Sequence, residues 1–292
     1  MRRWPAGLLL WGPEFRALAR PSQAVVWAGV PPCSGRLREI WPVTSEPASQ
    51  PATGAEIWII GGNSCAGKTT TARLLAHRLP LAAHVEGDEM QRLIVSGCRW
   101  AVPGDTDPGT GRLMGEAGVQ YALRIRNACL VAAAFADAGI TAILTDTIIN
   151  EGFESLTDVL GGRAVNFVVL RPPVALLRQR GVDRLPEEAA YLVGRYGDSD
   201  HPEAAEFAGR VQAAADGRAV NEFEEVIERG LDRLPHVGLW VDPSGLDPPS
   251  VVDLLLHRRA EAVWMVDAGS NKGAVAAPGR TRSAKRGTAA GP

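Results

Sequence analysis

From residue 56 onward, short apolar runs alternate with longer segments whose apolar residues recur with a helical period. The apolar runs predict buried strands at residues 57–60, 81–85, 140–145, 164–170 and 237–241. The segments between and after them predict helices at 71–79, 90–95, 115–138, 151–160, 173–180, 202–234 (interrupted near Gly217) and 250–262. Strands that alternate with helices favour a parallel sheet covered on both faces. We therefore expect an α/β fold of three layers around a five-stranded parallel sheet.

The two ends of the chain differ from this pattern. Prolines recur through residues 1–54, which excludes a long helix or a central strand there. We interpret residues 1–54 as a flexible Pro/Arg-rich extension, with a misassigned start or a docking arm as alternative explanations. Residues 265–292 are small and basic and predict a disordered tail. The domain itself is expected at 55–264, with a lid at about 181–200.

The first predicted strand runs directly into a glycine-bounded loop, Gly62-x-x-x-x-Gly67-Lys68-Thr69, and then into a predicted helix. A strand, this loop and a helix are the context of a phosphate-binding P-loop, the Walker A motif. Its backbone N–H groups and the helix N-terminus favour an anion. Lys68 is expected at the terminal phosphates and Thr69 at Mg²⁺. The predicted nucleotide-binding residues of this loop are Gly62, Asn63, Ser64, Cys65, Ala66, Gly67, Lys68, Thr69 and Thr70.

Lys68 is also the only lysine before Lys272, in a chain that otherwise uses arginine as its cation. The rigid arginine fork replaces a compact ammonium poorly at such a site. A glycine-rich turn that binds nothing is the alternative.

Composition narrows the class of protein without naming a substrate. Hydrophobic residues make up 46% of the chain and charged residues 22%, which is usual for a globular protein, and the formal net charge is −2. This charge gives no reason to expect nucleic acid or an anionic membrane as a partner. The four cysteines lie far apart, which argues against a disulfide framework or a zinc site. No apolar run has the length of a spanning helix, so we expect a cytoplasmic protein.

Acidic residues follow three of the predicted strands, at the sheet edge where ligands gather: Asp88, Asp146 and Asp242. Asp88 follows the second strand, and there a carboxylate can accept the proton of an attacking hydroxyl. The alternative is that Asp88 only caps the next helix, and Glu86 and Glu89 are nearby candidates for the base. Asp146 ends the third strand and could hold Mg²⁺ or orient substrate, although a solvated strand-end residue is as good an explanation.

Arginines follow the fourth strand. On a mobile lid, Arg180 and Arg184 could offset the charge that develops during phosphoryl transfer and could exclude water. A solvated helix face is the alternative interpretation for these arginines.

Four stretches together resemble small-molecule P-loop kinases: I-W-I-I-G-G-N-S-C-A-G-K-T-T, V-E-G-D, V-V-L-R-P-P-V-A-L-L-R-Q-R-G-V-D-R and L-W-V-D-P-S-G-L-D-P. They are most similar to the chloramphenicol phosphotransferase-like kinases, with shikimate and gluconate kinases as broader relatives. The resemblance covers about residues 55–262. It implies a P-loop NTPase fold, transfer from ATP to a hydroxyl, a base at Asp88 and lid arginines at Arg180 and Arg184. It also implies that the loop around 242–246, with Ser244, holds part of the adenine.

The sequence therefore predicts a kinase that uses ATP and Mg²⁺ and a small-molecule hydroxyl acceptor. One alternative is a zeta-toxin-like sugar-nucleotide kinase, and another is an ATP-binding regulatory protein without an acceptor. A GTPase switch is disfavoured because Asn271-Lys272-Gly273-Ala274 lacks the aspartate of the guanine motif.

Overall fold

A computed structural model describes residues 54–107, 109–196, 207–209, 211–212 and 224–267. Its centre is one sheet in which five parallel strands lie in the order β2-β3-β1-β4-β5. These strands are β1 (Ile57–Gly62), β2 (Ala82–Glu86), β3 (Thr141–Thr145), β4 (Ala164–Leu170) and β5 (Leu239–Val241). All five predicted strands are present, and the expected α/β fold with its mostly parallel sheet is confirmed.

Strand β1 is central because both of its faces are apolar. All six of its residues are buried, and it pairs in parallel with β3 on one side and β4 on the other. Such a run cannot occupy a sheet edge without exposing apolar side chains to water. The loop that follows Gly62 therefore starts in the middle of the sheet, at the carboxyl ends of the strands.

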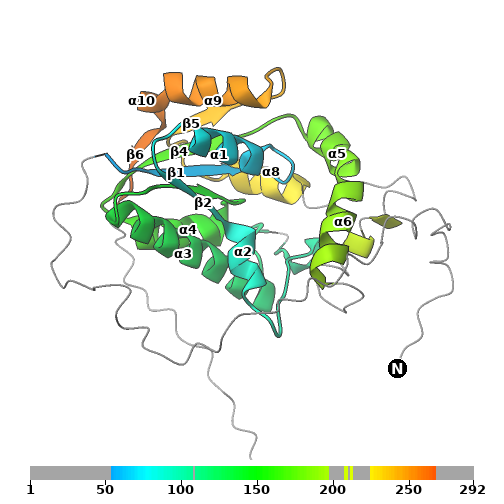
Figure 1. The fold of residues 1–292 in the computed structure, drawn as a ribbon. Coiled ribbons are helices and arrows are strands. Elements are labelled where there is room, and N and C mark those ends of the chain that lie inside the picture. Colours follow the sequence, from blue (N-terminus) through cyan, green and yellow to red (C-terminus); the bar gives the residue numbers. More distant parts are fainter. Residues whose placement is uncertain (1–53, 108, 197–206, 210, 213–223, 268–292) are drawn as a thin grey trace, which may run out of the picture. The chain divides into compact units, whose positions relative to one another are not determined.

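Helices cover both faces of the sheet (Figure 1). One face packs against α1 (Lys68–His77) and α9 (Pro248–His257), through a core that contains Trp58, Leu75 and Leu255. The other face packs against α3 (Gly115–Asp137), α4 (Asn150–Leu160) and α8 (Glu224–Asp232). The alternation of side chains along each strand supplies one core to each face.

The chain adds a strand that the sequence pattern did not predict. After α10 (Arg259–Ala262), β6 (Val263–Met265) pairs with the start of β4 in the antiparallel sense. The sheet thus has six strands: the five predicted parallel strands, and β6 as an antiparallel strand that was not predicted. Trp264 stacks on Phe153 at 5.4 Å between ring centroids, and Val266 is buried. Three residues at the start of a polar tail are too short a run for periodicity to identify.

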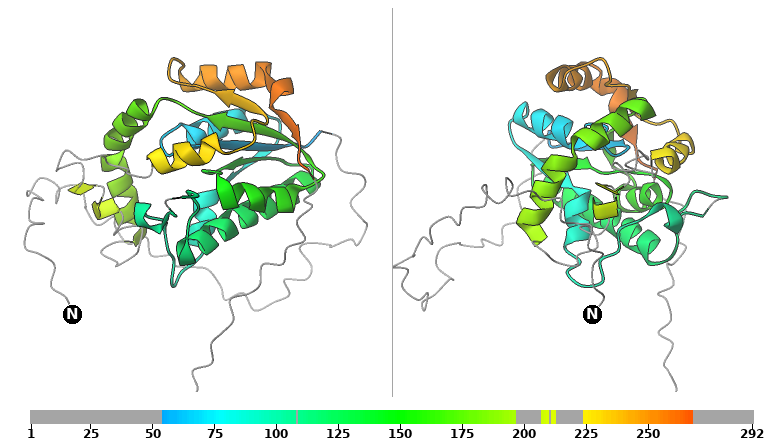
Figure 2. Two further views of the ribbon diagram at one scale, coloured as in Figure 1. Left: turned by 180° about the vertical axis from the view of Figure 1, so that it is seen from behind. Right: turned by 90° about the vertical axis from the view of Figure 1, so that its right-hand side faces the viewer.

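Several helix boundaries also differ from the sequence pattern. Helix α2 (Gly87–Arg92) begins at Gly87 rather than at residue 90. Beyond β4, α5 (Val174–Asp183) is followed by α6 (Leu185–Tyr196), so the described part of the predicted lid is helical. Figure 2 shows α5 and α6 extending away from the layered core. Much of the helix predicted at 202–234 lies outside the described residues, as do 1–53 and 268–292.

Between α2 and α3 lies a long loop, as expected, which contains a single 3₁₀ turn (Pro103–Asp105) and a bridge between Thr106 and Leu113. Within the described residues, no helix is both long and apolar enough to cross a membrane. The predicted domain boundaries are not tested by these features and stay predictions.

Candidate active site

The backbone between β1 and α1 has the shape of an anion cradle. Gly62 and Gly67 have φ values of 138° and 99° and Cys65 one of 61°, in the region that favours glycine. A Cβ on Gly62 would collide with the carbonyl oxygen of Leu170 in the neighbouring strand. Gly67 is the N-cap of α1, so the helix N-terminus opens directly onto the loop. These features fit the phosphate groups of a nucleotide.

Lys68 lies across this loop. Its Nζ donates to the carbonyl oxygens of Gly62 at 3.1 Å and Asn63 at 2.7 Å, and to Thr147 Oγ1 at 3.4 Å. Burial lowers the pKa of Lys68, and the nearby carboxylates of Asp146 and Asp88 oppose this shift. The ammonium group is therefore hydrogen-bonded to neutral oxygens, while the two carboxylates nearby favour its charged form. The charged group can exchange these neutral partners for phosphate oxygens.

The first residues of α1 reach the end of β2. Thr69 Oγ1 donates to Glu86 Oε1 at 3.0 Å, and Glu86 also faces Arg73 at 3.8 Å. A hydroxyl beside a carboxylate offers the oxygen ligands that Mg²⁺ prefers, with water filling the other positions. Among the described residues, no group of three or more His, Cys, Asp or Glu gathers as a metal site. The donors present therefore fit a metal that is completed by phosphate and water.

Asp88 lies in the first turn of α2, whose N-cap is Glu86 without a side-chain capping bond. The alternative role of Asp88 as the cap of this helix is thus wrong. Its side chain is 44% exposed and its Oδ1 lies 3.3 Å from Arg124 Nη1. Asp88 therefore has one oriented contact and a free approach from solvent, as a base for an incoming hydroxyl requires.

Asp146 is placed quite differently. Its side chain is 2% exposed, its Oδ1 accepts from Arg124 Nη2 at 2.6 Å and from the Thr147 N–H at 2.6 Å. Its Oδ2 has no hydrogen-bond partner in the part of the chain that the structure describes, and it lies against Gly87, where any Cβ would collide with it. Burial raises the pKa of Asp146 to about 6, opposed chiefly by Arg124. The metal role predicted for Asp146 is not tested by these contacts, and Glu86 is the acid that meets Thr69.

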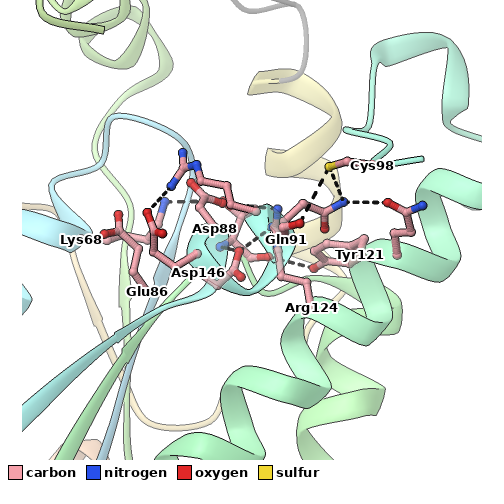
Figure 3. A network of polar contacts seen from close by, with 12 residues as sticks. Lys68, Glu86, Asp88, Gln91, Cys98, Tyr121, Arg124 and Asp146 are labelled. Carbon is pink, nitrogen blue, oxygen red and sulfur yellow. Dashed lines mark hydrogen bonds and ion pairs between the residues drawn. The ribbon is translucent and has the colours of Figure 1, made fainter. Parts of the chain in front are cut away.

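Figure 3 shows Arg124 reaching from α3 toward the acids at the ends of β2 and β3. Arg124 has a side chain that is only 10% exposed and faces both Asp88 and Asp146. Arg124 was not among the site residues predicted from the sequence. Its signal was the position of a charged residue among the buried residues Tyr121, Ile125 and Ala128 of one long helix.

Arg124 belongs to a chain of cation–π contacts that we call the ladder: Tyr191, Arg92, Trp100, Arg124 and Tyr121. The guanidinium carbon of Arg124 lies 5.2 Å from the ring centroid of Tyr121 and 5.7 Å from that of Trp100. Arg92 lies 5.7 Å from Trp100 and 5.4 Å from Tyr191. The ladder thus connects α6 to α3 through α2 and the loop after it. Contacts between segments this far apart in sequence leave no local pattern.

The loop that carries Trp100 is fixed by two glutamines. Gln91 Nε2 donates to Gln120 Oε1 and to the carbonyl oxygen of Arg99, each at 3.1 Å, and Gln120 Nε2 donates to the Gly97 carbonyl at 2.8 Å. The start of the long loop is therefore held between α2 and α3, beside Asp88.

The predicted lid arginines meet the phosphate-binding loop. Arg180 Nη1 donates to the carbonyl oxygen of Cys65 at 3.3 Å, and Arg184 Nη1 lies 3.5 Å from Cys65 Sγ. Arg178 instead pairs with Glu224 and Glu225 of α8. Arg180 and Arg184 are therefore directed at the site and Arg178 is not, and the role of the first two there is still a prediction.

The remaining predicted residues are Ser64 and Ala66 in the phosphate-binding loop, Thr70 in the first turn of α1, and Ser244. Ala66 is buried, Thr70 is exposed, and the Ser64 N–H donates to Asn63 Oδ1 at 2.8 Å. Ser244 lies in the turn after β5, where its N–H donates to Asp242 Oδ1 at 2.9 Å. Its contact with a nucleotide stays a prediction.

Comparison with known proteins adds a set of distant structural neighbours. No family model matches the chain, and no curated protein matches it in sequence. A sugar kinase from Janibacter sp. HTCC2649 is 17% identical, with 71% of this chain and 96% of that chain covered and a TM-score of 0.43. The tunicamycin resistance protein of Deinococcus radiodurans is 18% identical, with 72% and 98% covered and a TM-score of 0.39. Shikimate kinase from Acinetobacter baumannii is 18% identical, with 70% and 92% covered and a TM-score of 0.37.

Two of these three solved structures are a sugar kinase and a shikimate kinase. With identities below 25% and TM-scores below 0.5, these neighbours carry no weight in the assignment of substrate or of individual residues. The function is argued below from this chain's own residues.

Proposed function

We propose that this protein is a P-loop kinase that transfers the γ-phosphate of ATP to a hydroxyl group of a small molecule. The observation that carries the proposal is the position of Asp88. Its half-exposed carboxylate lies at the carboxyl edge of the sheet, close enough to Lys68 to oppose the lowering of that residue's pKa. A phosphate cradle and a solvent-facing carboxylate at one edge are what transfer to a hydroxyl needs.

Each residue of the site has a separate task in this proposal. The loop from Gly62 to Thr70 holds the phosphates, and Lys68 exchanges its carbonyl contacts for phosphate oxygens. Mg²⁺ at Thr69, with Glu86 beside it, would offset phosphate charge when bound. Asp146 would contribute to the metal site only indirectly, because Arg124 and Thr147 already engage its Oδ1 and its Oδ2 is buried against Gly87.

The transfer step uses Asp88 as the base. The acceptor oxygen forms a bond to the γ-phosphorus, the bond from phosphorus to the β–γ bridging oxygen breaks, and ADP leaves. The acceptor hydroxyl proton passes to Asp88, which Arg124 keeps in one orientation. Arg180 and Arg184 lie at Cys65 and would offset charge on the migrating group from the lid side.

The test is ADP release with Mg-ATP against a panel of hydroxylated metabolites and antibiotics, each run beside Lys68→Ala. We expect one class of acceptor to stimulate ADP release in the wild-type protein and not in the variant, with ³¹P NMR identifying the phosphorylated product. Nucleotide binding without acceptor-stimulated release from any class would contradict the proposal and favour an ATP-binding regulatory protein.

We also propose a reducing compartment such as the cytoplasm as the place of action. The cysteines that the structure describes, Cys65, Cys98 and Cys129, are all free thiols. One of them lies within the phosphate-binding loop itself, so oxidation would threaten the site. Fractionation of the cells that produce the protein tests this assignment.

A further inference from the structure

The side chain of Asn63, the second residue of the phosphate-binding loop, is directed away from the nucleotide side and toward α8. It is fully buried. Its Nδ2 donates to the carbonyl oxygen of Glu224 at 3.0 Å and to Glu228 Oε1 at 2.9 Å. Its Oδ1 accepts from the N–H of Ser64 at 2.8 Å, so one side chain connects the loop backbone to the helix. The amide of an asparagine side chain can make four hydrogen bonds, two as donor and two as acceptor. Buried Asn63 makes three of them.

Glu228 holds a second group besides Asn63. Its Oε2 accepts from Arg171 Nε at 2.8 Å, and Arg171 also pairs with the exposed Asp232. The side chain of Glu228 is 15% exposed, so these are partly buried, charge-assisted contacts. Because Arg171 directly follows β4, Glu228 is fixed to the sheet on one side and to the loop on the other.

Glu224, one turn earlier in α8, faces the lid. Its carboxylate accepts from Arg178 Nε of α5 at 2.9 Å, and its side chain is 2% exposed. Its carbonyl oxygen is the other acceptor of Asn63. Helix α8 therefore contacts the loop that would bind phosphate, the strand end after β4 and the helix that carries Arg180.

We propose that Glu228 is a positioning residue for nucleotide binding, which acts through Asn63 to hold the phosphate-binding loop in its binding shape. The inference rests on the nucleotide-binding half of the proposed function and does not depend on the acceptor. A loop whose N–H groups must converge on an anion pays an ordering cost when it binds. The contact from Asn63 to Glu228 orders the loop when the protein folds, so less order has to be gained when the nucleotide binds. Loss of the contact should therefore weaken phosphate binding more than it weakens the fold.

The experiment titrates Mg-ADP and Mg-ATP into the full-length protein by calorimetry and compares variants of three residues. We expect Glu228→Ala to weaken nucleotide binding about tenfold, the size expected for loss of one charge-assisted hydrogen bond. Glu228→Gln keeps an acceptor for Asn63 Nδ2 and should recover part of the lost affinity. Asp232→Ala is the matched control, since it removes the other partner of Arg171 and leaves Asn63 untouched.

A double-variant cycle separates a role in positioning from a role in stability. Asn63→Ala should weaken binding as Glu228→Ala does, and adding Glu228→Ala to it should weaken binding little further. Thermal unfolding of each variant, measured without nucleotide, reports stability separately. Because Asn63→Ala and Glu228→Gln test the same contact, the inference does not depend on Glu228→Ala being well folded.

Three outcomes would overturn the inference. Glu228→Ala could lower the unfolding temperature while the folded protein keeps wild-type nucleotide affinity. Asp232→Ala could weaken binding as much as Glu228→Ala, which would assign the effect to Arg171. The losses of nucleotide affinity caused by Asn63→Ala and Glu228→Ala could also be additive in the double variant. In each case the wild-type protein binds nucleotide and the proposed function stands, whereas a wild-type protein that bound neither nucleotide would refute both.

Discussion

Arg124 contacts two aspartates whose surroundings differ at the scale of single side chains. Asp146 is buried and has its pKa raised by burial, whereas Asp88 is 44% exposed and open to solvent. Two carboxylates that share one guanidinium can thus have separate tasks, one that anchors the arginine and one that faces substrate. This division makes Asp88 the residue whose charge should matter for turnover.

Asp88→Asn should lower acceptor-dependent turnover at least about 100-fold, because removal of a general base typically costs that much. Mg-ADP affinity should change little, since the amide still fits beside Arg124. Steady-state kinetics with the acceptor found by the panel, together with calorimetry, measure both quantities. Near-normal turnover would show that Asp88 is not the base, and Glu86 and Glu89 would then be tested in the same way.

The burial of His84 makes the stability of the folded protein depend on pH. This histidine lies in β2 with Nε2 2.8 Å from Thr145 Oγ1, and burial lowers its pKa. The unfolded chain therefore takes up a proton near pH 6.5, while the folded protein resists it until a lower pH. The contribution of His84 to stability should be constant above about pH 7 and should fall as the pH drops below the unfolded pKa.

The measurement is urea unfolding of wild-type protein and His84→Gln between pH 7.5 and pH 5.5. The variant keeps a hydrogen-bonding group for Thr145 and has no proton to take up, so it should lose less stability over this range. Equal losses in the two proteins would show that protonation of His84 does not cause the acid sensitivity.

At the scale of elements, the ladder is a set of contacts whose residues come from several helices and a loop. It joins α6, α2, the following loop and α3 through Tyr191, Arg92, Trp100, Arg124 and Tyr121. Trp100 is its middle member and touches both arginines. The indole Nε1 is buried without a hydrogen-bond partner among the described residues, so the ring contributes through its face.

Trp100→Leu should lower the free energy of unfolding by about 2 kcal/mol, from two partly buried cation–π contacts of about 1 kcal/mol each. Trp100→Phe keeps a ring face, loses no described hydrogen bond and should restore about half of the difference. Urea unfolding of the three proteins provides the comparison. If Trp100→Phe were as unstable as Trp100→Leu, packing volume rather than the ring face would explain the effect.

The strands were predictable at this scale because each is a continuous apolar run, such as 57–60 or 164–170. The start of α2 was not, because Gly87 is a poor helix former by itself. It stands at that position since only a glycine fits beside Asp146 Oδ2. A tertiary contact therefore decided the boundary, and it also placed Asp88 inside the helix rather than at its cap.

At the scale of the whole molecule, the P-loop and its edge of the sheet follow from sequence, since β1, the loop and α1 are adjacent in the chain. Arg124 and Glu228 could not be selected in this way. Their partners Asp88, Asp146 and Asn63 lie far away in sequence, and the distance is closed only by the packing of α3 and α8 on the sheet.

The predicted domain can be tested by truncation at its C-terminal strand. A fragment of residues 54–267 should fold and bind Mg-ADP like the full chain. A fragment of 54–262 lacks β6, the stacking of Trp264 on Phe153 and the buried Val266. It should lose roughly 3 kcal/mol of stability, because it lacks the partly buried Trp264 together with the buried Val266. Urea unfolding of both fragments checks this, and equal stabilities would show that β6 is dispensable.

The position of Lys68 allows one amine of the domain to be labelled selectively. It is the only lysine before Lys272, and its amine rests on the carbonyl oxygens of Gly62 and Asn63 with a lowered pKa. A nucleotide that carries an amine-reactive acyl group on its terminal phosphate would deliver that group to one side chain of the domain. Mass spectrometry of the one peptide that contains Lys68 would then measure the fraction of the protein that had bound the nucleotide. This measurement works in a cell extract and does not require the acceptor.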